Sequence, residues 1–330
     1  MTAVRDQMGF VEAFASAKLG QNKVLEGIAG EVQWYRIEKL LRKLKPEGAG
    51  RPPYDPLVMF KGLLLAQLYN LSDAELEQAL NDRFSFRRFL GLALEQDAPD
   101  HTTLCRFRNR LIEAGLADKL FAEFDRQLEG RGMVLKRGTM IDATMVAAAV
   151  APPRGDDLAD ATDQDARFAK NASTGETTYG YKAHLGVDQG TRLIRAVELT
   201  PANVNETTVA DGLIRGDERA VYADKAYAKR ARRQALKAAG IKDRIMHKTW
   251  GGGPPLSHWQ KLHNRQISPI RAEVETVFAV FKCRLGYRGV RYIGIVKNRA
   301  AVILKAIAYN LRRLADLAGR TMPAVRAQAA

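Results

Sequence analysis

The spacing of apolar residues changes near residue 132 and divides the chain into two parts. Before that point, apolar positions recur three and four residues apart, which predicts an almost entirely helical segment. Ser72-Asp-Ala-Glu75 has the form of a capping box, and Asp100 can cap a helix that continues through Leu111. We therefore expect an all-helical N-terminal domain over residues 1–132.

From Met133 onward, the pattern is typical of strands that alternate with helices. Met133–Val146 is apolar on both faces, as a central strand is, and Gln189-Gly190 is the turn signal of a hairpin. The strands predicted after the first are Tyr179–Asp188, Leu193–Thr200, Ala220–Lys225 and Lys242–Lys248, and the helices are Glu206–Ile214, Ala228–Ala239 and Asn298–Ala318. Pro152–Thr178 is predicted to be a polar loop. This order predicts an α/β fold with a mixed sheet flanked by helices.

One predicted helix, Ser268–Lys282, carries charged residues at the edge of an apolar face. At 100° per residue, one arc holds Ile270, Val274, Val277, Phe278 and Phe281. Arg271, Glu275 and Lys282 form a stripe beside that arc. By itself this pattern is equally that of an amphipathic helix with an ordinary i,i+4 ion pair.

Composition favours a polyanionic partner. The formal net charge is +15 and the pI about 9.8, which makes nucleic acid the first candidate and an anionic membrane surface the second. The longest apolar runs are too short to span a bilayer, and the N-terminus has no signal-peptide pattern. Cys105 and Cys283 lack metal-binding spacing, so we expect reduced thiols in a cytoplasmic protein.

The helix after Asp100 has two possible interpretations. Its buried stripe is predicted to be Leu104, Phe107 and Leu111, and its outer face Arg106, Asn109 and Arg110. Short helices that end in one with such a face resemble a helix-turn-helix reader, in which Arg106 and Arg110 would contact DNA. A solvated face of a helical bundle explains the same pattern.

Two aspartates occupy predicted strands. Asp142 lies within the first strand and Asp224 at the end of a later one, and burying an unpaired carboxylate is costly. Thr144 shares a strand face with Asp142 and could donate a hydrogen bond to it, so each aspartate could be purely structural. If both converge with Glu275, however, the oxygen ligands suit Mg²⁺ or Mn²⁺ and phosphodiester chemistry by two metal ions.

These motifs resemble those of the DDE transposases of bacterial insertion sequences, in particular the group numbered five. The resemblance rests on Met140-Ile-Asp-Ala-Thr144, Tyr222-Ala-Asp-Lys-Ala-Tyr227, and Arg271, Glu275 and Lys282 at the spacing of the group's C-terminal signature. Supporting matches are Pro99-Asp-His-Thr-Thr-Leu104, Tyr179-Gly-Tyr-Lys182, Thr200-Pro-Ala-Asn203 and Tyr309-Asn-Leu311.

The resemblance implies an RNase H-like catalytic domain over residues 133–318, followed by a tail over 319–330. It implies that Asp142, Asp224 and Glu275 are the catalytic and metal-binding triad, with Mg²⁺ as the ion and Mn²⁺ as a substitute. Arg271, Lys282 and Lys225 would contact DNA, and residues 1–132 would bind DNA and form multimers. The implied activity is cleavage at the terminal inverted repeats and attack of the freed 3′-hydroxyl on target DNA, by a homodimer or higher multimer at the bacterial nucleoid.

Ser268 departs from the signature, which usually has a tyrosine at that position. The loss of an aromatic ring would affect DNA contacts and leave the carboxylates unchanged. Two other functions remain open: a catalytically silent, domesticated DNA-binding protein and an RNase H-like nuclease of another kind.

Overall fold

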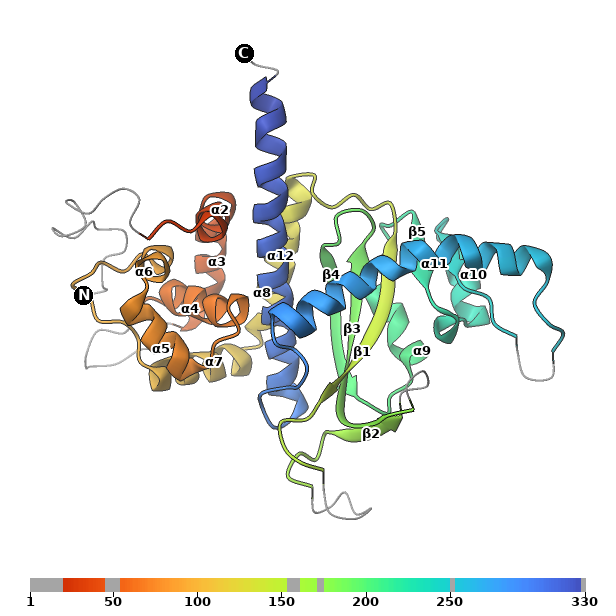
Figure 1. Cartoon of the computed structure of the whole chain (residues 1–330), viewed down its shortest axis with the longest axis horizontal. Coiled ribbons are helices and arrows are strands. Elements are labelled where there is room, and N and C mark those ends of the chain that lie inside the picture. The colour runs from red at the N-terminus through yellow and green to blue at the C-terminus, as the bar shows by residue number, and fades with distance from the viewer. Residues whose placement is uncertain (1–19, 45–53, 153–160, 171–174, 250–252, 328–330) are drawn as a thin grey trace. The chain divides into compact units, whose positions relative to one another are not determined.

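The chain divides into two compact units. The computed structural model describes residues 20–44, 54–152, 161–170, 175–249 and 253–327, with side chains described as far as residue 318. One unit contains the described residues up to Leu128 together with those from Ile303 onward, and the other contains the described residues of Glu129–Val302. Figure 1 shows the elements of both units along the chain.

The first unit is helical, as the sequence predicts. Its helices are α2 (Lys23–Glu31), α3 (Trp34–Leu41), α4 (Pro56–Leu68), α5 (Asp73–Asp82), α6 (Phe84–Leu90), α7 (His101–Glu113), α8 (Leu116–Gly130) and most of α12 (Ile295–Ala327), with the 3₁₀ turn η1 (Arg42–Leu44). The predicted capping box at the start of α5 is confirmed: Ser72 Oγ accepts from the Glu75 N–H, and the Glu75 carboxylate accepts from the Ser72 N–H.

Helix α4 forms the centre of this unit. Lys61 is the only residue of α4 that is not buried, so the helix is apolar on all sides rather than along one stripe. Asp55 accepts from the Leu57 N–H at 2.7 Å, and Pro56 starts the helix where its missing N–H costs nothing. Helices α3, α5, α6 and α7 pack against it.

The second unit contains a six-stranded mixed sheet. Its strands are β1 (Thr139–Ala147), β2 (Arg167–Lys170), β3 (Thr177–Asp188), β4 (Ile194–Pro201), β5 (Ala220–Ala223) and β6 (Lys242–Ile245). The order is β2-β3-β1-β5-β6, and β4 pairs with β3 beyond the residues that β2 pairs with. β1 is antiparallel to β3 and parallel to β5, and β5 is parallel to β6. The predicted hairpin and the predicted mixed sheet flanked by helices are confirmed.

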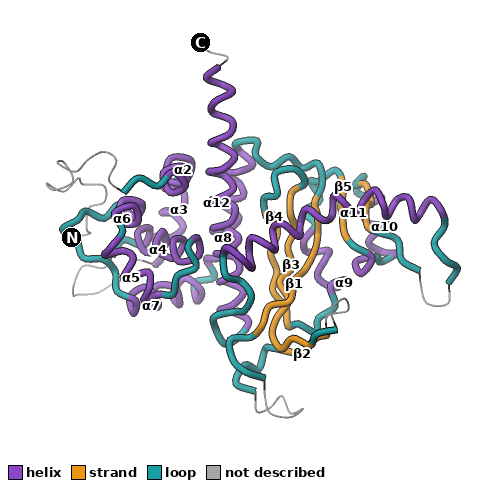
Figure 2. Tube along the Cα trace, in the orientation of Figure 1, coloured by secondary structure: helices purple, strands orange, loops and turns teal. Residues whose placement is uncertain are grey.

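Helices lie along this sheet. The 3₁₀ turn η3 (Ala210–Leu213), which follows the short helix α9 (Glu206–Val209), and α10 (Arg230–Ala238) share a buried apolar cluster with Ile141 of β1. Helix α11 (His258–Ala279) packs against β1 and β5, and Figure 2 shows it crossing the strands. Since side chains alternate along a strand, Ile141 faces the cluster formed with η3 and α10, and Asp142 faces α11.

Several elements differ from the prediction, including the strand predicted to contain Asp224, which ends at Ala223. The first strand starts at Thr139 rather than Met133, because the Leu135 and Lys136 N–H groups donate to the Asp188 carboxylate instead of to a neighbouring strand. β2 lies within the segment predicted to be a loop, of which residues 153–160 and 171–174 fall outside the described part. Helix α11 begins at His258, well before Ser268, and carries Pro269 inside it. Ser268-Pro269 resembles a helix start locally, but packing continues the helix through it.

The C-terminal part of the chain also differs in its grouping. Residues from Ile303 onward belong to the unit of the N-terminal helices, whereas the sequence groups residues 133–318 in one domain. The predicted tail is helical as far as Ala327, and residues 328–330 lie outside the described part. The functional division at residue 132 stays a prediction.

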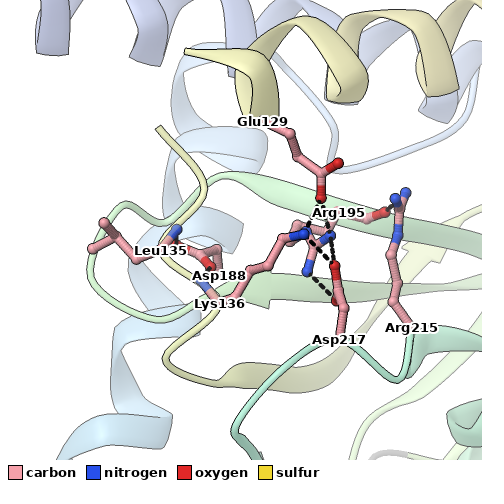
Figure 3. A network of polar contacts seen from close by, with 7 residues as sticks. All are labelled: Glu129, Leu135, Lys136, Asp188, Arg195, Arg215 and Asp217. Atoms are coloured by element: carbon pink, nitrogen blue, oxygen red, sulfur yellow. Dashed lines mark hydrogen bonds and ion pairs between the residues drawn. The ribbon is translucent and has the colours of Figure 1, made fainter. Parts of the chain in front are cut away.

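A buried ion-pair network fixes the start of the second unit to its sheet (Figure 3). Arg195 of β4 is 1% exposed and donates to both oxygens of Asp217, at 2.8 and 2.9 Å, and to Glu129 at 2.9 Å. Lys136 pairs with the same two acids, at 2.8 Å to Asp217 and 2.9 Å to Glu129. The Arg195 guanidinium, ahead of the Lys136 ammonium, holds the pKa of Asp217 well below its usual value.

Candidate active site

Asp142 lies within β1 with both carboxylate oxygens engaged. Its side chain is 18% exposed, Oδ1 accepts from the Ala143 N–H at 2.9 Å, and Oδ2 accepts from Arg271 at 3.0 Å. The hydrogen bond from Thr144 that the sequence suggests is absent from the described structure. Asp142 is therefore held by a backbone N–H and by a cation from another element.

Arg271 connects Asp142 to Glu275. Its Nη1 lies 3.0 Å from Asp142 Oδ2, and its Nη2 lies 2.5 Å from Glu275 Oε1, one helical turn further along α11. The i,i+4 ion pair that the sequence allows, between Arg271 and Glu275, is thus present. Arg271 also pairs with Asp142, which lies 129 residues earlier in the chain. The Glu275 side chain is 58% exposed, so one of the two linked acids faces solvent.

Asp224 approaches Asp142 through the strand register. It follows β5 directly, and its Oδ1 accepts from the Ala226 N–H at 2.7 Å, which caps the 3₁₀ turn η4 (Lys225–Tyr227). Met140 of β1 is in register with Tyr222 of the parallel strand β5. Continued by two residues, this register sets Asp224 beside Asp142.

The electrostatics around Asp142 indicate several neighbouring acids. The pKa of Asp142 is raised to about 6: burial, the largest cause, raises it, the Ala143 N–H and Arg271 lower it, and the charges of Asp224 and Glu206 raise it. Burial and then the charges of Glu206, Asp142 and Asp224 raise the pKa of the fully buried Tyr227. These three carboxylates therefore lie near enough to Tyr227 to act on its hydroxyl electrostatically.

Sequence reasoning missed Glu206. It is the first residue of α9, and its carboxylate lies 3.3 Å from Lys182 Nζ, which also donates to the Val204 carbonyl at 3.1 Å. Lys182 and Glu206 line an open groove of about 450 Å³ that also borders Met145 and Ala226. The sequence feature that could have revealed Glu206 is its position at the start of a predicted helix that follows Thr200-Pro-Ala-Asn203.

The chemistry of these groups fits a hard divalent cation, although their present arrangement does not yet form a ligand cage. Asp142, Asp224 and Glu275 offer carboxylate oxygens, which Mg²⁺ and Mn²⁺ prefer. Among the described residues, no three side chains of His, Cys, Asp or Glu come close enough together to hold a metal ion. Between Asp142 and Glu275 lies a positive group, the Arg271 guanidinium, so this position already accommodates a cation.

The predicted DNA-binding residues differ in how exposed they are. Lys225 is exposed directly after Asp224, and Lys282 is half-buried in the π-helical turn η5 (Val280–Arg284) that continues α11. In the first unit, Arg106 is exposed on α7, whereas Arg110 donates to the Leu44 carbonyl. Ser268, where the family signature has tyrosine, is exposed on α11.

Comparisons with known proteins agree with this arrangement. The family model described as "Transposase DDE domain" matches residues 135–311, and one described as "Transposase domain (DUF772)" matches residues 14–110. The first match covers more than half of the chain, and the chain therefore belongs to the family of DDE-domain transposases. The comparisons do not assign it to the group numbered five within that family.

A solved structure is also similar to the chain over most of its length. It is the cryo-EM structure of the piggyBac transposase synaptic complex with hairpin DNA, with 11% sequence identity and a TM-score of 0.43 over 90% of this chain and 73% of that chain. A likeness this weak supports no inference.

Membership of the family sets the class of chemistry. Transposases act on DNA, and their DDE domains depend on divalent metal ions. The described helices include none that is both long enough and apolar enough to cross a bilayer.

Proposed function

We propose that this protein cleaves DNA at the ends of an insertion sequence and joins the freed 3′-hydroxyl to target DNA. Asp142, Asp224 and Glu275 would hold the metal ions. The observation that carries the proposal is the link from Asp142 through Arg271 to Glu275, with Asp224 in adjacent register. A purely structural aspartate has no need of a second and third acid beside it.

Two displacements at phosphorus make up the proposed reaction. In the first, a water oxygen bonds to the phosphorus at the element's end, the P–O3′ bond breaks, and the chain end leaves as a 3′-hydroxyl. In the second, that hydroxyl oxygen attacks a target phosphate and displaces the target's 3′ oxygen. Bound divalent metal would activate the attacking oxygen and stabilise the leaving one. The attacking group is water in the first displacement and a DNA hydroxyl in the second, so no covalent bond to the protein forms.

The basic residues near the carboxylates would position the DNA. Lys225, adjoining Asp224, and Lys282, one turn beyond the end of α11, would neutralise phosphates on either side of the scissile bond. In the helical unit, Arg106 on α7 would meet the terminal repeat. The net charge of +15 supports a DNA-bound protein at the bacterial nucleoid.

Pairing two element ends requires at least two copies of the chain, so we propose a homodimer or a higher multimer. Light scattering of the protein with end DNA would show an even number of chains per complex. A stable complex of one chain with one end that still completes joining would contradict this assignment.

The function is tested with DNA that carries the element's terminal repeats. The purified chain should cut it with Mg²⁺ or Mn²⁺ and not with EDTA, and should yield joined products when target DNA is present. Asp142→Asn, Asp224→Asn and Glu275→Gln should each abolish both products. The matched control is Glu273→Gln, which removes an acid from the same helix whose partner is Arg192, 3.1 Å away.

The outcomes separate the competing functions. DNA binding without cleavage under any metal would identify a silent, domesticated protein. Cleavage without joined products would identify another RNase H-like nuclease. Full activity of Glu275→Gln would show that Glu275 is not a metal ligand.

A further inference from the structure

The two carboxylates that Arg271 joins each accept a hydrogen bond from its guanidinium. One oxygen of Asp142 accepts from the Ala143 N–H and the other accepts from Arg271. Glu275 Oε1 accepts from the same guanidinium. Arg271 uses a different amino group for each acid, so it sits between them as a bridging cation. A metal ion that bridged both acids would have to lie between them, where the guanidinium now lies.

Metal and guanidinium therefore compete for one position. Both are cations, and at a partly buried site their mutual repulsion adds to the loss of two charge-assisted hydrogen bonds. The Arg271 side chain is 20% exposed and the Asp142 side chain 18%, so bulk water does little to screen this competition. Metal binding is thus opposed as long as Arg271 keeps both contacts.

A second anion would relieve the competition. The planar guanidinium can present two parallel N–H donors to a phosphate, which makes a DNA phosphate a good alternative partner. Glu275 is 58% exposed and lies on the solvent side of Arg271, so a phosphate can approach the guanidinium from that side. An arginine that turns to a phosphate leaves both carboxylates free.

We propose that Arg271 couples DNA binding to assembly of the metal site. Without DNA it neutralises Asp142 and Glu275 and opposes metal binding. With DNA, a backbone phosphate takes the guanidinium and the two acids become available to the metal. This role rests on the function proposed above and adds to it a reason for the protein to load metal only when DNA is present.

Such coupling is reciprocal. If DNA tightens metal binding by some factor, metal tightens DNA binding by the same factor, and couplings between sites are typically about 5- to 150-fold. The coupling should vanish when Arg271 loses its charge, since no cation of the protein then lies between the two carboxylates without DNA.

The test measures Mn²⁺ affinity of the full-length chain by electron paramagnetic resonance, with and without a short duplex carrying the terminal repeat, after subtraction of Mn²⁺ bound by the duplex alone. The wild type should bind Mn²⁺ about fivefold or more tightly with DNA. Arg271→Gln should bind it more tightly than the wild type without DNA, and DNA should then change the affinity little. Arg271→Lys keeps the positive charge but lacks the bidentate guanidinium donor, so it should retain partial coupling.

Arg192→Gln is the matched control, because it removes another arginine that is paired with an acid of α11, Glu273. It should show wild-type coupling. Equal Mn²⁺ affinity of the wild type with and without DNA would overturn the proposal, and so would weaker Mn²⁺ binding by DNA-free Arg271→Gln. The proposed function fails separately, if Asp142→Asn and Glu275→Gln bind Mn²⁺ as the wild type does. Circular dichroism would establish that each variant is folded. If Arg271→Gln is not folded, the Mn²⁺ affinities of Arg271→Lys with and without DNA decide the outcome.

Discussion

Lys182 of β3 and Glu206 of α9 form an ion pair of 3.3 Å beside the candidate active site. Lys182 is 8% exposed, and its other hydrogen bond goes to the Val204 carbonyl at 3.1 Å. The pair joins the start of a short helix to the middle of the sheet. It also fixes Glu206, whose charge acts on both Asp142 and Tyr227.

Glu206→Gln should lower the free energy of unfolding by about 1–2 kcal/mol, because it leaves a buried ammonium without its carboxylate. Urea unfolding of Glu206→Gln, Lys182→Met and the double variant would measure the coupling between the two residues. We expect the double variant to be more stable than the sum of the single losses predicts. Strict additivity would contradict a direct interaction.

Cleavage activity should depend on Asp224 and much less on Glu206. Asp224→Asn removes a proposed metal ligand and should reduce the rate of end cleavage at least about a hundredfold, equivalent to about 3 kcal/mol of transition-state stabilisation. Glu206→Gln should retain most of the activity at temperatures where it is folded. Single-turnover cleavage of a labelled end duplex would compare the two, and the opposite ranking would make Glu206 a ligand instead.

The Arg195–Asp217 pair should make stability depend on pH. Arg195 depresses the pKa of Asp217 in the folded protein, so the pair stabilises the fold at all pH values above the unfolded carboxyl pKa of about 4. That contribution is lost as the pH falls below about 4 and Asp217 becomes protonated. Asp217→Asn should therefore lower the melting temperature at neutral pH and have a shrinking effect in acid, measured by circular dichroism. An effect independent of pH would show that the charge of Asp217 is not what stabilises the fold.

DNA affinity should fall steeply with salt, and particular lysines should account for part of the slope. Lys225→Gln and Lys282→Gln should each weaken binding similarly for all sequences and reduce the log–log salt slope by about one. Lys237→Gln, on the exposed side of α10, is the control and should leave the slope unchanged. Fluorescence anisotropy over a salt series gives the slopes, and a flat response in the wild type would contradict electrostatic binding.

Two of the arginines on α7, Arg106 and Arg110, should separate DNA binding from stability. Arg106 is exposed and should be replaceable by Gln with loss of repeat-DNA affinity but no change in unfolding. Arg110 donates to the Leu44 carbonyl, so Arg110→Gln should destabilise the helical unit. Matched melting and binding curves of both variants would check this. Loss of stability with Arg106→Gln would point to a structural role for that side chain.

Much of the second unit was predictable from local pattern. Gln189-Gly190 marked the hairpin, and four residues of the predicted apolar arc, Val274, Val277, Phe278 and Phe281, are buried. The fifth, Ile270, is only partly buried. Such features depend on neighbours a few residues away, and period and turn chemistry reveal them. Asp142 and Asp224 were noticeable because an acid inside an apolar strand conflicts with its surroundings.

Tertiary structure decided which charges serve as internal partners. Arg230, Arg232 and Arg233 look alike in the sequence, yet Arg232 is 3% exposed and bonds to Asp211 and to two carbonyls, while Arg233 pairs with Asp243. The bridge from Arg271 to Asp142 joins residues far apart in the chain. Sequence determined where acids and bases stand on their own helix or strand, because that follows from backbone period. Packing of α11 on β1 alone determined that Arg271 reaches both carboxylates, because an ion pair depends on distances that no local pattern encodes.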